Sequence, residues 1–390
     1  MRIGYIYDLK AFPPKGGNHR HAYELTKGFI KFGHEVSVVD DPTMPSTTNY
    51  TSELSDLKSF IESIDILYVR IDARLTRKWT VLNKLMVLLD NRPVVWEINS
   101  PASENLAYSW LGGKAAFNNT QPESSLKKLK RWFHAVRKMP GIFVEEQHRK
   151  KLARFVNHAI CVSGAVGKYA AHDLGIRNIS IMPNGGPLIT NDEIVERDKR
   201  RNDNDFTVVY TGSAIYPWQG LNILIEAINI SASQSLGLKF VIATNQKTDM
   251  LPVTSNCLVL VGLTQDEVRD VICSADVCVA MIPEWPWAKY GFHGSPTKLF
   301  EYMALRRTVV TSNHGQMSEI LNDGIDAILC SYDTNELLSK LLELKSNREK
   351  TRMIGKNAWQ RVHEEFNWGC ITEKTLLIFE SIVNRNSKTY

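Results

Sequence analysis

The chain has 390 residues, more than one ordinary domain of about 100–200 residues contains, so two domains are expected. Hydrophobic residues make up 43% of it and charged residues 23%, which is typical of a globular protein that buries a sizeable core. The net charge of +5 is too small to indicate nucleic-acid binding by itself.

The six cysteines form no Cys-x-x-Cys pair and have no metal-ligand spacing. Most lie in apolar stretches and are expected to be buried free thiols in a reducing compartment. The N-terminal Met-Arg-Ile-Gly-Tyr-Ile-Tyr predicts a strand and not the apolar core of a signal peptide. No apolar run reaches the roughly 18 residues of a spanning helix. We therefore expect a cytoplasmic protein, either free or peripheral on the inner face of a membrane.

The first half of the chain alternates short apolar runs with helical patterns. A strand at Arg2–Tyr7, a glycine-containing loop at Pro13–Gly17, a helix that ends at Gly33 and a strand at Glu35–Val39 form one βαβ unit. Such units build parallel sheets. Further strands are predicted at Ile66–Val69, Pro93–Ile98 and Ala159–Val162.

Residues 125–154 interrupt this alternation with a basic stretch that contains aromatic residues. Lys127, Lys128, Lys130 and Arg131 stand directly before Trp132 and Phe133, and more lysines and arginines follow. This mixture suits a surface next to anionic lipid, and a solvated helical hairpin explains it equally well. Nucleic acid is not expected as a partner, because no stacking platform or recognition motif accompanies the charge.

The second half repeats the α/β pattern after a polar stretch, Thr190–Asp205, which is interpreted as an interdomain linker. Strands are predicted at Thr207–Tyr210, Lys239–Ala243, Cys257–Val261, Val277–Ala280, Thr308–Ser312 and Ala327–Leu329, and helices at Leu221–Ile230, Pro296–Leu305, Thr334–Phe366 and Ile371–Asn384. The sequence thus predicts two successive doubly wound domains. Ligands bind at the carboxyl ends of such sheets, so the interface between the domains is the expected active site.

The clearest chemical signal is the helix that opens after Gly294-Ser295-Pro296-Thr297. Its free backbone amides and positive dipole end suit a diphosphate. Lys298 adds a cation in the first turn, and Glu301 shares its face, where it could reach a ribose hydroxyl pair. A capped amphipathic helix with a solvated Lys–Glu pair would have the same pattern.

Ser-Pro-Thr-Lys-Leu-Phe-Glu-Tyr-Met-Ala at 295–304 resembles the donor-site helix of retaining glycosyltransferase family 4, of the GT-B fold, in a subgroup with a Ser-Pro-x-Lys helix. Other pieces that resemble the family follow in its order: Gly16-Gly17, Gly33-His34-Glu35-Val36, Cys161-Val162-Ser163, Ile181-Met182-Pro183-Asn184-Gly185, Tyr210-Thr211-Gly212 and Phe366-Asn367-Trp368.

The resemblance implies an α/β, GT-B chain with two Rossmann-like domains facing each other across a cleft. Residues 1–187 would bind the acceptor and residues 188–370 the nucleotide sugar, with the C-terminal helix, 371–390, crossing back to the first domain. It implies retaining transfer of a hexosyl unit from a nucleotide diphosphate sugar to a glycan or lipid-linked glycan, as in polysaccharide biosynthesis. No cofactor or metal is implied, since no Asp-x-Asp motif and no His/Asp cluster is present.

The resemblance also implies roles for single residues. Glu301 would bind the ribose, and the backbone at Gly262 the base. Ser295, Thr297, Lys298 and Leu299 belong to the donor helix, and His293 stands where the family has a glutamate that faces the donor sugar. After Gly212, Ser213 and Gln219 replace a usual arginine and lysine, so Lys298 is expected to be the chief cation for the diphosphate. We therefore take His293, Lys298 and Glu301 as the catalytic candidates.

The first domain offers weaker candidates. Gly16-Gly17 could form an anion-binding nest or a plain tight turn. One of the two histidines that follow could face the cleft, and His19 is taken as a contact to acceptor or sugar. Glu97 and Asn99 end a buried strand at the cleft edge. A buried glutamate is costly unless it is paired. Glu97 could therefore contact the acceptor or the donor sugar, or it could cap a neighbouring loop.

Two other functions are compatible with parts of this pattern. A non-catalytic sugar-nucleotide-binding partner of another transferase would explain the departures at His293, Ser213 and Gln219. A GT-B epimerase or phosphorylase-like enzyme would need acidic general catalysts, a cofactor lysine or a bound phosphate, and neither pattern is apparent.

Overall fold

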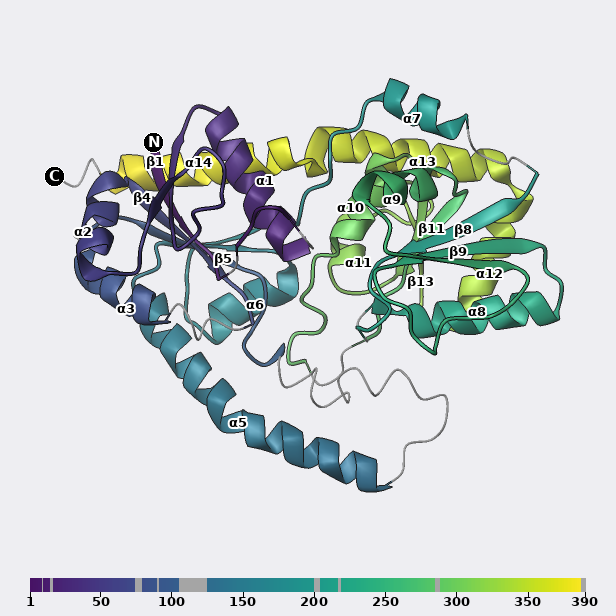
Figure 1. Ribbon diagram of the computed structural model, residues 1–390, viewed down its shortest axis with the longest axis horizontal. Helices are drawn as coiled ribbons and strands as arrows, with labels where there is room; N and C mark the ends of the chain where they lie inside the picture. The colour runs from purple at the N-terminus through teal and green to yellow at the C-terminus, as the bar shows by residue number, and fades with distance from the viewer. Residues whose placement is uncertain are drawn as a thin grey trace.

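The computed structural model describes residues 1–8, 10–14, 17–73, 79–89, 91–104, 125–199, 204–216, 219–284 and 288–386. Two parallel sheets, each flanked by helices, lie next to each other, and the last helices run across both (Figure 1). This arrangement confirms the predicted GT-B architecture of two Rossmann-like domains.

The first sheet has seven parallel strands in the order β3-β2-β1-β4-β5-β6-β7. Its strands are β1 (Arg2–Ile6), β2 (Glu35–Val39), β3 (Thr48–Tyr50), β4 (Ile66–Ile71), β5 (Val94–Ile98), β6 (His158–Cys161) and β7 (Ile179–Ile181). Its helices are α1 (Gly17–Lys31), α2 (Leu54–Ser63), α3 (Trp79–Leu88), α5 (Ser125–Ala153) and α6 (Gly164–His172).

Both faces of this sheet are buried, because successive residues of a strand point to opposite sides. In β4, Ile66 and Tyr68 pack in the core beneath α1 and the C-terminal helix. Leu67 and Val69 pack on the other side with α2, α3 and α6. This double burial is why the strands read as continuous apolar runs in the sequence.

The second sheet has six parallel strands in the order β10-β9-β8-β11-β12-β13. Its strands are β8 (Phe206–Thr211), β9 (Leu238–Thr244), β10 (Cys257–Val261), β11 (Val277–Ala280), β12 (Thr308–Ser312) and β13 (Ile328–Cys330). Its helices are α7 (Asn191–Asp198), α8 (Leu221–Ser233), α9 (Gln265–Cys273), α10 (Thr297–Ala304), α11 (Gln316–Ile320), α12 (Thr334–Ser346) and α13 (Arg348–Arg361).

The chain passes between the domains twice, and the two passages are hydrogen-bonded to each other. The amide of Gly186 donates to the Phe366 carbonyl at 2.7 Å, and the amide of Trp368 donates to the Gly186 carbonyl at 3.1 Å. A Cβ on Gly186 would lie 2.8 Å from the Phe300 carbonyl oxygen, so only glycine fits there. The two passages therefore form one compact joint.

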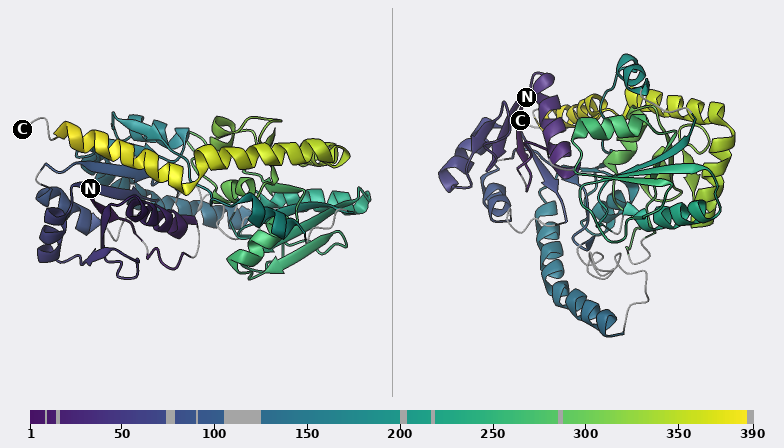
Figure 2. Two further views of the ribbon diagram at one scale, coloured as in Figure 1. Left: turned by 90° about the horizontal axis from the view of Figure 1, so that it is seen from above. Right: turned by 45° about the vertical axis from the view of Figure 1, so that its right-hand side comes forward.

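Beyond this joint, a π-helical turn (Val362–Phe366) leads into α14 (Trp368–Asn386), which returns to the first domain. Figure 2 shows α13 and α14 as one continuous yellow band across both domains. Phe379 of α14 packs against Phe29 of α1 and Tyr68 of β4, with ring centroids 5.7 Å and 5.0 Å apart. The crossing-back helix of the predicted fold is thus present.

Two expectations about local structure are wrong. The polar stretch 190–205 is not only a linker: its first part is α7, capped by Thr190 and held to α9 by the ion pairs of Arg197 with Asp266 and Asp270. Residues 125–153 form one long helix, α5, where a helical hairpin was one of the interpretations. Within the described residues, no helix is long and apolar enough to cross a membrane.

Candidate functional site

The turn after β8 gathers three polar groups around one glycine. Gly212 has a φ of +144°, and a Cβ at this position would lie 2.9 Å from Lys298 Nζ, 3.2 Å from Tyr210 Oη and 3.3 Å from Gln219 Oε1. Only glycine keeps this space open. The geometry explains why a glycine, a lysine and a glutamine that are distant in sequence belong to one site.

Lys298 carries a buried ammonium group. Its side chain is 9% exposed, and its ammonium has no hydrogen-bond partner within the part of the chain that the structure describes. The ammonium lies 4.1 Å from the centroid of the Tyr210 ring, which provides a cation–π contact. Burial lowers the pKa of Lys298 from its ordinary 10.5 to about 7, against the opposing effect of Glu301. An anion bound here would compensate this charge.

The first turn of α10 adds backbone donors to the same region. No described side chain caps the helix at Pro296, which leaves the amides of Thr297 and Lys298 as the candidate donors to a ligand. Thr297 opens the helix and is half-buried. Leu299 is fully buried in the domain core, and its amide donates to the Pro296 carbonyl at 3.1 Å. Dipole and amides thus favour an anion close to the Lys298 ammonium.

Glu301 lies one turn further along α10 and faces charges of both domains. Burial raises the pKa of its carboxyl, while Arg20 of α1, Arg269 of α9 and Lys298 act in the opposite direction. The influence of Arg20 shows that the start of α1 lies close to α10. The carboxyl is thus placed at the boundary between the domains.

The remaining predicted donor residues occupy strand ends. The Oε1 of Gln219 is buried and has no hydrogen-bond partner among the described residues. The carbonyl of Ser213 accepts a hydrogen bond from the Tyr210 hydroxyl at 3.1 Å, so Ser213 braces the Gly212 turn. Gly262 ends β10 with a φ of +75° and is exposed. Gly17 is the first residue of α1, and Gly16 lies outside the described residues.

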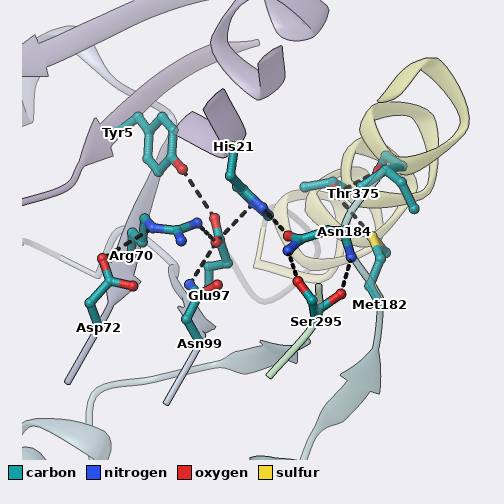
Figure 3. A network of polar contacts seen from close by, with 11 residues as sticks. Tyr5, His21, Arg70, Asp72, Glu97, Asn99, Met182, Asn184, Ser295 and Thr375 are labelled. Atoms are coloured by element: carbon teal, nitrogen blue, oxygen red, sulfur yellow. Dashed lines mark hydrogen bonds and ion pairs between the residues drawn. The ribbon is translucent and has the colours of Figure 1, made fainter. Parts of the chain in front are cut away.

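Glu97 of β5 is the centre of a buried polar network in the first domain (Figure 3). Its carboxylate accepts hydrogen bonds from Tyr5 at 3.0 Å and Asn99 at 2.9 Å, and pairs with the Arg70 guanidinium of β4. Burial would raise the pKa of Glu97, but Arg70, His21 and Asn99 more than offset this and hold it well below its ordinary value. With 1% exposure and this set of partners, Glu97 is occupied by internal contacts.

A histidine extends this network to the second domain. His21 Nε2 lies 2.9 Å from Glu97 Oε1, and His21 Nδ1 lies 2.5 Å from the Asn184 amide oxygen. The Asn184 side-chain nitrogen donates to the Ser295 carbonyl at 2.6 Å, and the Asn184 backbone amide donates to the Ser295 hydroxyl at 2.8 Å. Both ring nitrogens of His21 thus lie close to side-chain oxygens, one from each side of the network. Figure 3 shows this path from Glu97 to the loop before α10.

His293 lies at a second contact between the domains. Its Nε2 is 3.5 Å from the carboxylate of Glu104, and its backbone carbonyl accepts from the Ser163 hydroxyl at 2.9 Å. The start of α6 is held nearby, where the Gly164 amide donates to the Glu319 carboxylate at 2.9 Å. Glu319 thus complements the dipole of a helix in the other domain.

The structure therefore brings together Gly212, Gln219 and Lys298, with Glu301 on the same helix. It separates His19, whose Nδ1 contacts the Lys10 carbonyl at 2.7 Å, from the buried network that contains His21. Sequence reasoning missed Tyr5, Arg70 and Asn184. His21 had a usable signal, because it shares one helix face with the buried Leu25 and Phe29. Among the described residues, no group of three or more His, Cys, Asp or Glu side chains could hold a metal ion.

Comparison with protein families matches both halves of the chain. Residues 15–187 match the model described as Glycosyltransferase Family 4, and residues 205–347 match the model described as Glycosyl transferases group 1. The two matches together cover most of the chain and meet near the joint between the domains.

Individual relatives are distant. The MMP alpha-(1->4)-mannosyltransferase of Mycolicibacterium hassiacum is 25% identical over 268 residues, which are 65% of this chain and 61% of that protein, less than two thirds of its length. Sucrose-phosphate synthase from Thermosynechococcus elongatus is 13% identical with a TM-score of 0.67, over 98% of this chain and 99% of that one. Anabaena HepE in complex with UDP and glucose is 13% identical with a TM-score of 0.66, over 98% and 100%. At this identity the two structures show a shared fold.

The first prediction concerns Glu97. Replacement by Gln removes the charge that neutralises Arg70 but keeps the shape, so it should lower the free energy of unfolding at pH 7 by on the order of 3 kcal/mol. Because the folded-state pKa is depressed, this loss should shrink as the pH falls below about 4.5, the ordinary value. Urea unfolding at several pH values measures this loss of stability. The control is Glu62→Gln, at an exposed position on α2. A Glu97→Gln variant as stable as wild type would show that the carboxylate is free for a ligand.

The second prediction concerns Lys298. Between pH 7 and 10.5 the unfolded chain holds a proton on this residue that the folded chain lacks, so the stability of the wild type should rise with pH. Lys298→Met removes the buried charge and keeps the stem. The variant should therefore melt at a higher temperature than wild type at pH 7 and below, and this difference should disappear toward pH 10.5. Thermal melts over this range, with the exposed Lys58→Met as the control, measure it. A difference that does not depend on pH would contradict the assigned pKa.

Proposed function

We propose that this chain, which belongs to the glycosyltransferases of the GT-B fold, transfers a hexosyl unit from a nucleotide diphosphate sugar to a glycan or lipid-linked glycan acceptor, with retention of configuration. The observation that carries the proposal is the buried ammonium of Lys298 beside Gly212 and the start of α10, where no described residue forms a hydrogen bond with the ammonium or caps the helix with its side chain. Such an arrangement suits a diphosphate. Anabaena HepE, which shares the fold, has been solved in complex with UDP and glucose.

The chemistry follows from where charge develops. Transfer breaks the bond between the anomeric carbon and the diphosphate oxygen, and the electron pair stays on the diphosphate. Lys298 and the α10 amides are already oriented toward this region, so they stabilise the growing negative charge without reorganisation. We propose that these groups act in place of a metal ion. A protonated Lys298 also gives the bound diphosphate a hydrogen-bond donor.

The nucleotide end of the donor is assigned to the strand ends of the second domain. Glu301 lies on α10 one turn beyond Lys298, within reach of the ribose of a nucleotide whose diphosphate sits at the helix start. The exposed Gly262, at the end of β10, offers its backbone to the base. The acceptor would approach from the first domain, where the starts of α1 and α6 face the second domain.

Donor binding tests the proposal directly. A panel of nucleoside diphosphates and their sugars should contain a ligand that stabilises the protein by about 2.7 kcal/mol at a hundredfold excess over its Kd. Glu301→Gln should weaken that binding by roughly 1.5–3 kcal/mol without lowering the melting temperature of the free protein, because a charge-assisted bond to the ribose is lost. The control is again Glu62→Gln. Glu301→Gln binding like wild type would remove Glu301 as the ribose ligand, and no binding by any donor would overturn the proposed function.

Lys298→Met tests the reaction. It should lower the rate of sugar transfer at least tenfold, equivalent to about 1.4 kcal/mol of transition-state stabilisation, while Lys58→Met leaves it unchanged. Calorimetry at pH 8 in buffers of different ionisation enthalpy should show proton uptake on diphosphate binding in wild type but not in Lys298→Met. Normal transfer by the variant would mean that other groups hold the diphosphate. Donor binding by wild type without transfer or hydrolysis would identify a non-catalytic binding partner.

A further inference from the structure

Helix α5 has two parts with different surroundings. Figures 1 and 2 show that its C-terminal end joins the first domain and that the rest extends away from both sheets. The joined part, from Glu145 on, is held by internal bonds: Arg149 is fully buried and donates to the Ser100 carbonyl at 2.9 Å, and Glu145 accepts from the Trp79 indole at 2.6 Å. The extended part, residues 125–144, thus projects from an anchored end, with Pro140 inside the helix.

The extended part exposes a continuous apolar stripe. Leu126, Leu129, Phe133 and Val136 recur at three-to-four spacing and Phe143 follows seven residues later, so they share one side of the helix. Leu126, Leu129, Phe133 and Phe143 are 68%, 54%, 59% and 65% exposed. Further exposed apolar residues border the stripe: Trp132, Met139 and Val144. Single exposed apolar residues are ordinary, but an aligned row of them indicates a surface that contacts something.

Basic residues flank the stripe and continue around the helix. Successive residues advance by about 100° around a helix, which places Arg137 and Lys130 along one edge of the stripe and His134 and Lys138 further toward the opposite side. No aspartate or glutamate occurs from residue 125 to 144. The two acidic residues of α5, Glu145 and Glu146, belong to the anchored part, where Glu146 accepts from the Tyr169 hydroxyl at 2.6 Å. The extended part of the helix therefore carries only basic charges, and the acidic residues of α5 lie in its anchored part.

We propose that the extended part of α5 docks on an anionic lipid bilayer, with its apolar stripe below the headgroups and its basic residues against lipid phosphates. An apolar stripe flanked by lysine and arginine is the pattern of a helix that lies in the membrane interface, and the Trp132-Phe133 pair suits that depth. A second copy of the chain is a poorer occupant, since pairing two stripes would bring together two basic segments without acidic counterparts. The inference does not depend on the proposed function.

Flotation with lipid vesicles tests this docking. At 50 mM salt the protein should float with vesicles of phosphatidylcholine and phosphatidylglycerol and not with phosphatidylcholine alone, and 0.5 M salt should release it. Lys130→Gln combined with Arg137→Gln should lower the partition coefficient about 30-fold, since each basic residue near the surface contributes about 1 kcal/mol. Trp132→Ser combined with Phe133→Ser should lower it at least tenfold.

The matched control removes two apolar residues elsewhere. Leu54→Ser with Leu377→Ser, which are 52% and 59% exposed on α2 and α14, should bind vesicles like wild type. Absence of wild-type binding to anionic vesicles would overturn the proposal. Equal losses in the α5 variant and in the control would overturn it too, because binding would then not reside in α5. A stable dimer in gel filtration without lipid, abolished by Trp132→Ser with Phe133→Ser, would assign the stripe to self-association instead.

Discussion

The structure depends on how one buried carboxylate is neutralised. Glu97 stands in the middle of a seven-stranded sheet, where an unpaired charge would be prohibitively costly. Its partners come from β1, β4 and α1, so its neutralisation fixes the relative positions of three elements. Through His21 and Asn184 the same interactions reach Ser295, directly before the donor helix α10. This chain of contacts therefore links the buried carboxylate of the first domain to the segment that precedes the candidate ligand site in the second domain.

Lys298 is the opposite case, a buried charge that the described part of the protein leaves without a hydrogen-bond partner. Glu97 is satisfied by internal partners, and its pKa moves so as to favour the charged form. The pKa of Lys298 moves so as to favour the neutral form, because burial is opposed only by Glu301. A buried charge with internal partners, such as Glu97, stabilises the fold. A buried charge such as Lys298 destabilises the fold until a ligand supplies the opposite charge. Proximity to Gly212 and to the α10 amides indicates an anionic ligand.

The sequence predicts structure that depends on neighbouring residues, such as the strands, but not contacts between residues far apart in the chain. The observed bounds of β10 (Cys257–Val261) and β12 (Thr308–Ser312) agree with the predicted ones to the residue, because each is a short run rich in apolar and β-branched residues. The role of Glu97 could not be predicted, since its partners lie 92, 27 and 76 positions away and only the fold brings them together. His19 and His21 lie at the same loop-to-helix junction, and the sequence alone does not tell which of them faces the interior. Their exposure differs only because residues two apart point to different sides of a helix.

Helix α5 and the polar network around Glu97 are attached to the same two strands of the first domain. Arg149, which anchors α5, donates to the backbone carbonyls of Asp72 and Ser100. These residues directly follow β4 and β5, the strands that carry Arg70 and Glu97. The contacts of Arg149 therefore connect the anchored end of α5 to the strand ends that hold the polar network. If α5 lies on a bilayer as proposed, the membrane fixes the orientation of those strand ends, and with them the side of the domain interface from which an acceptor approaches.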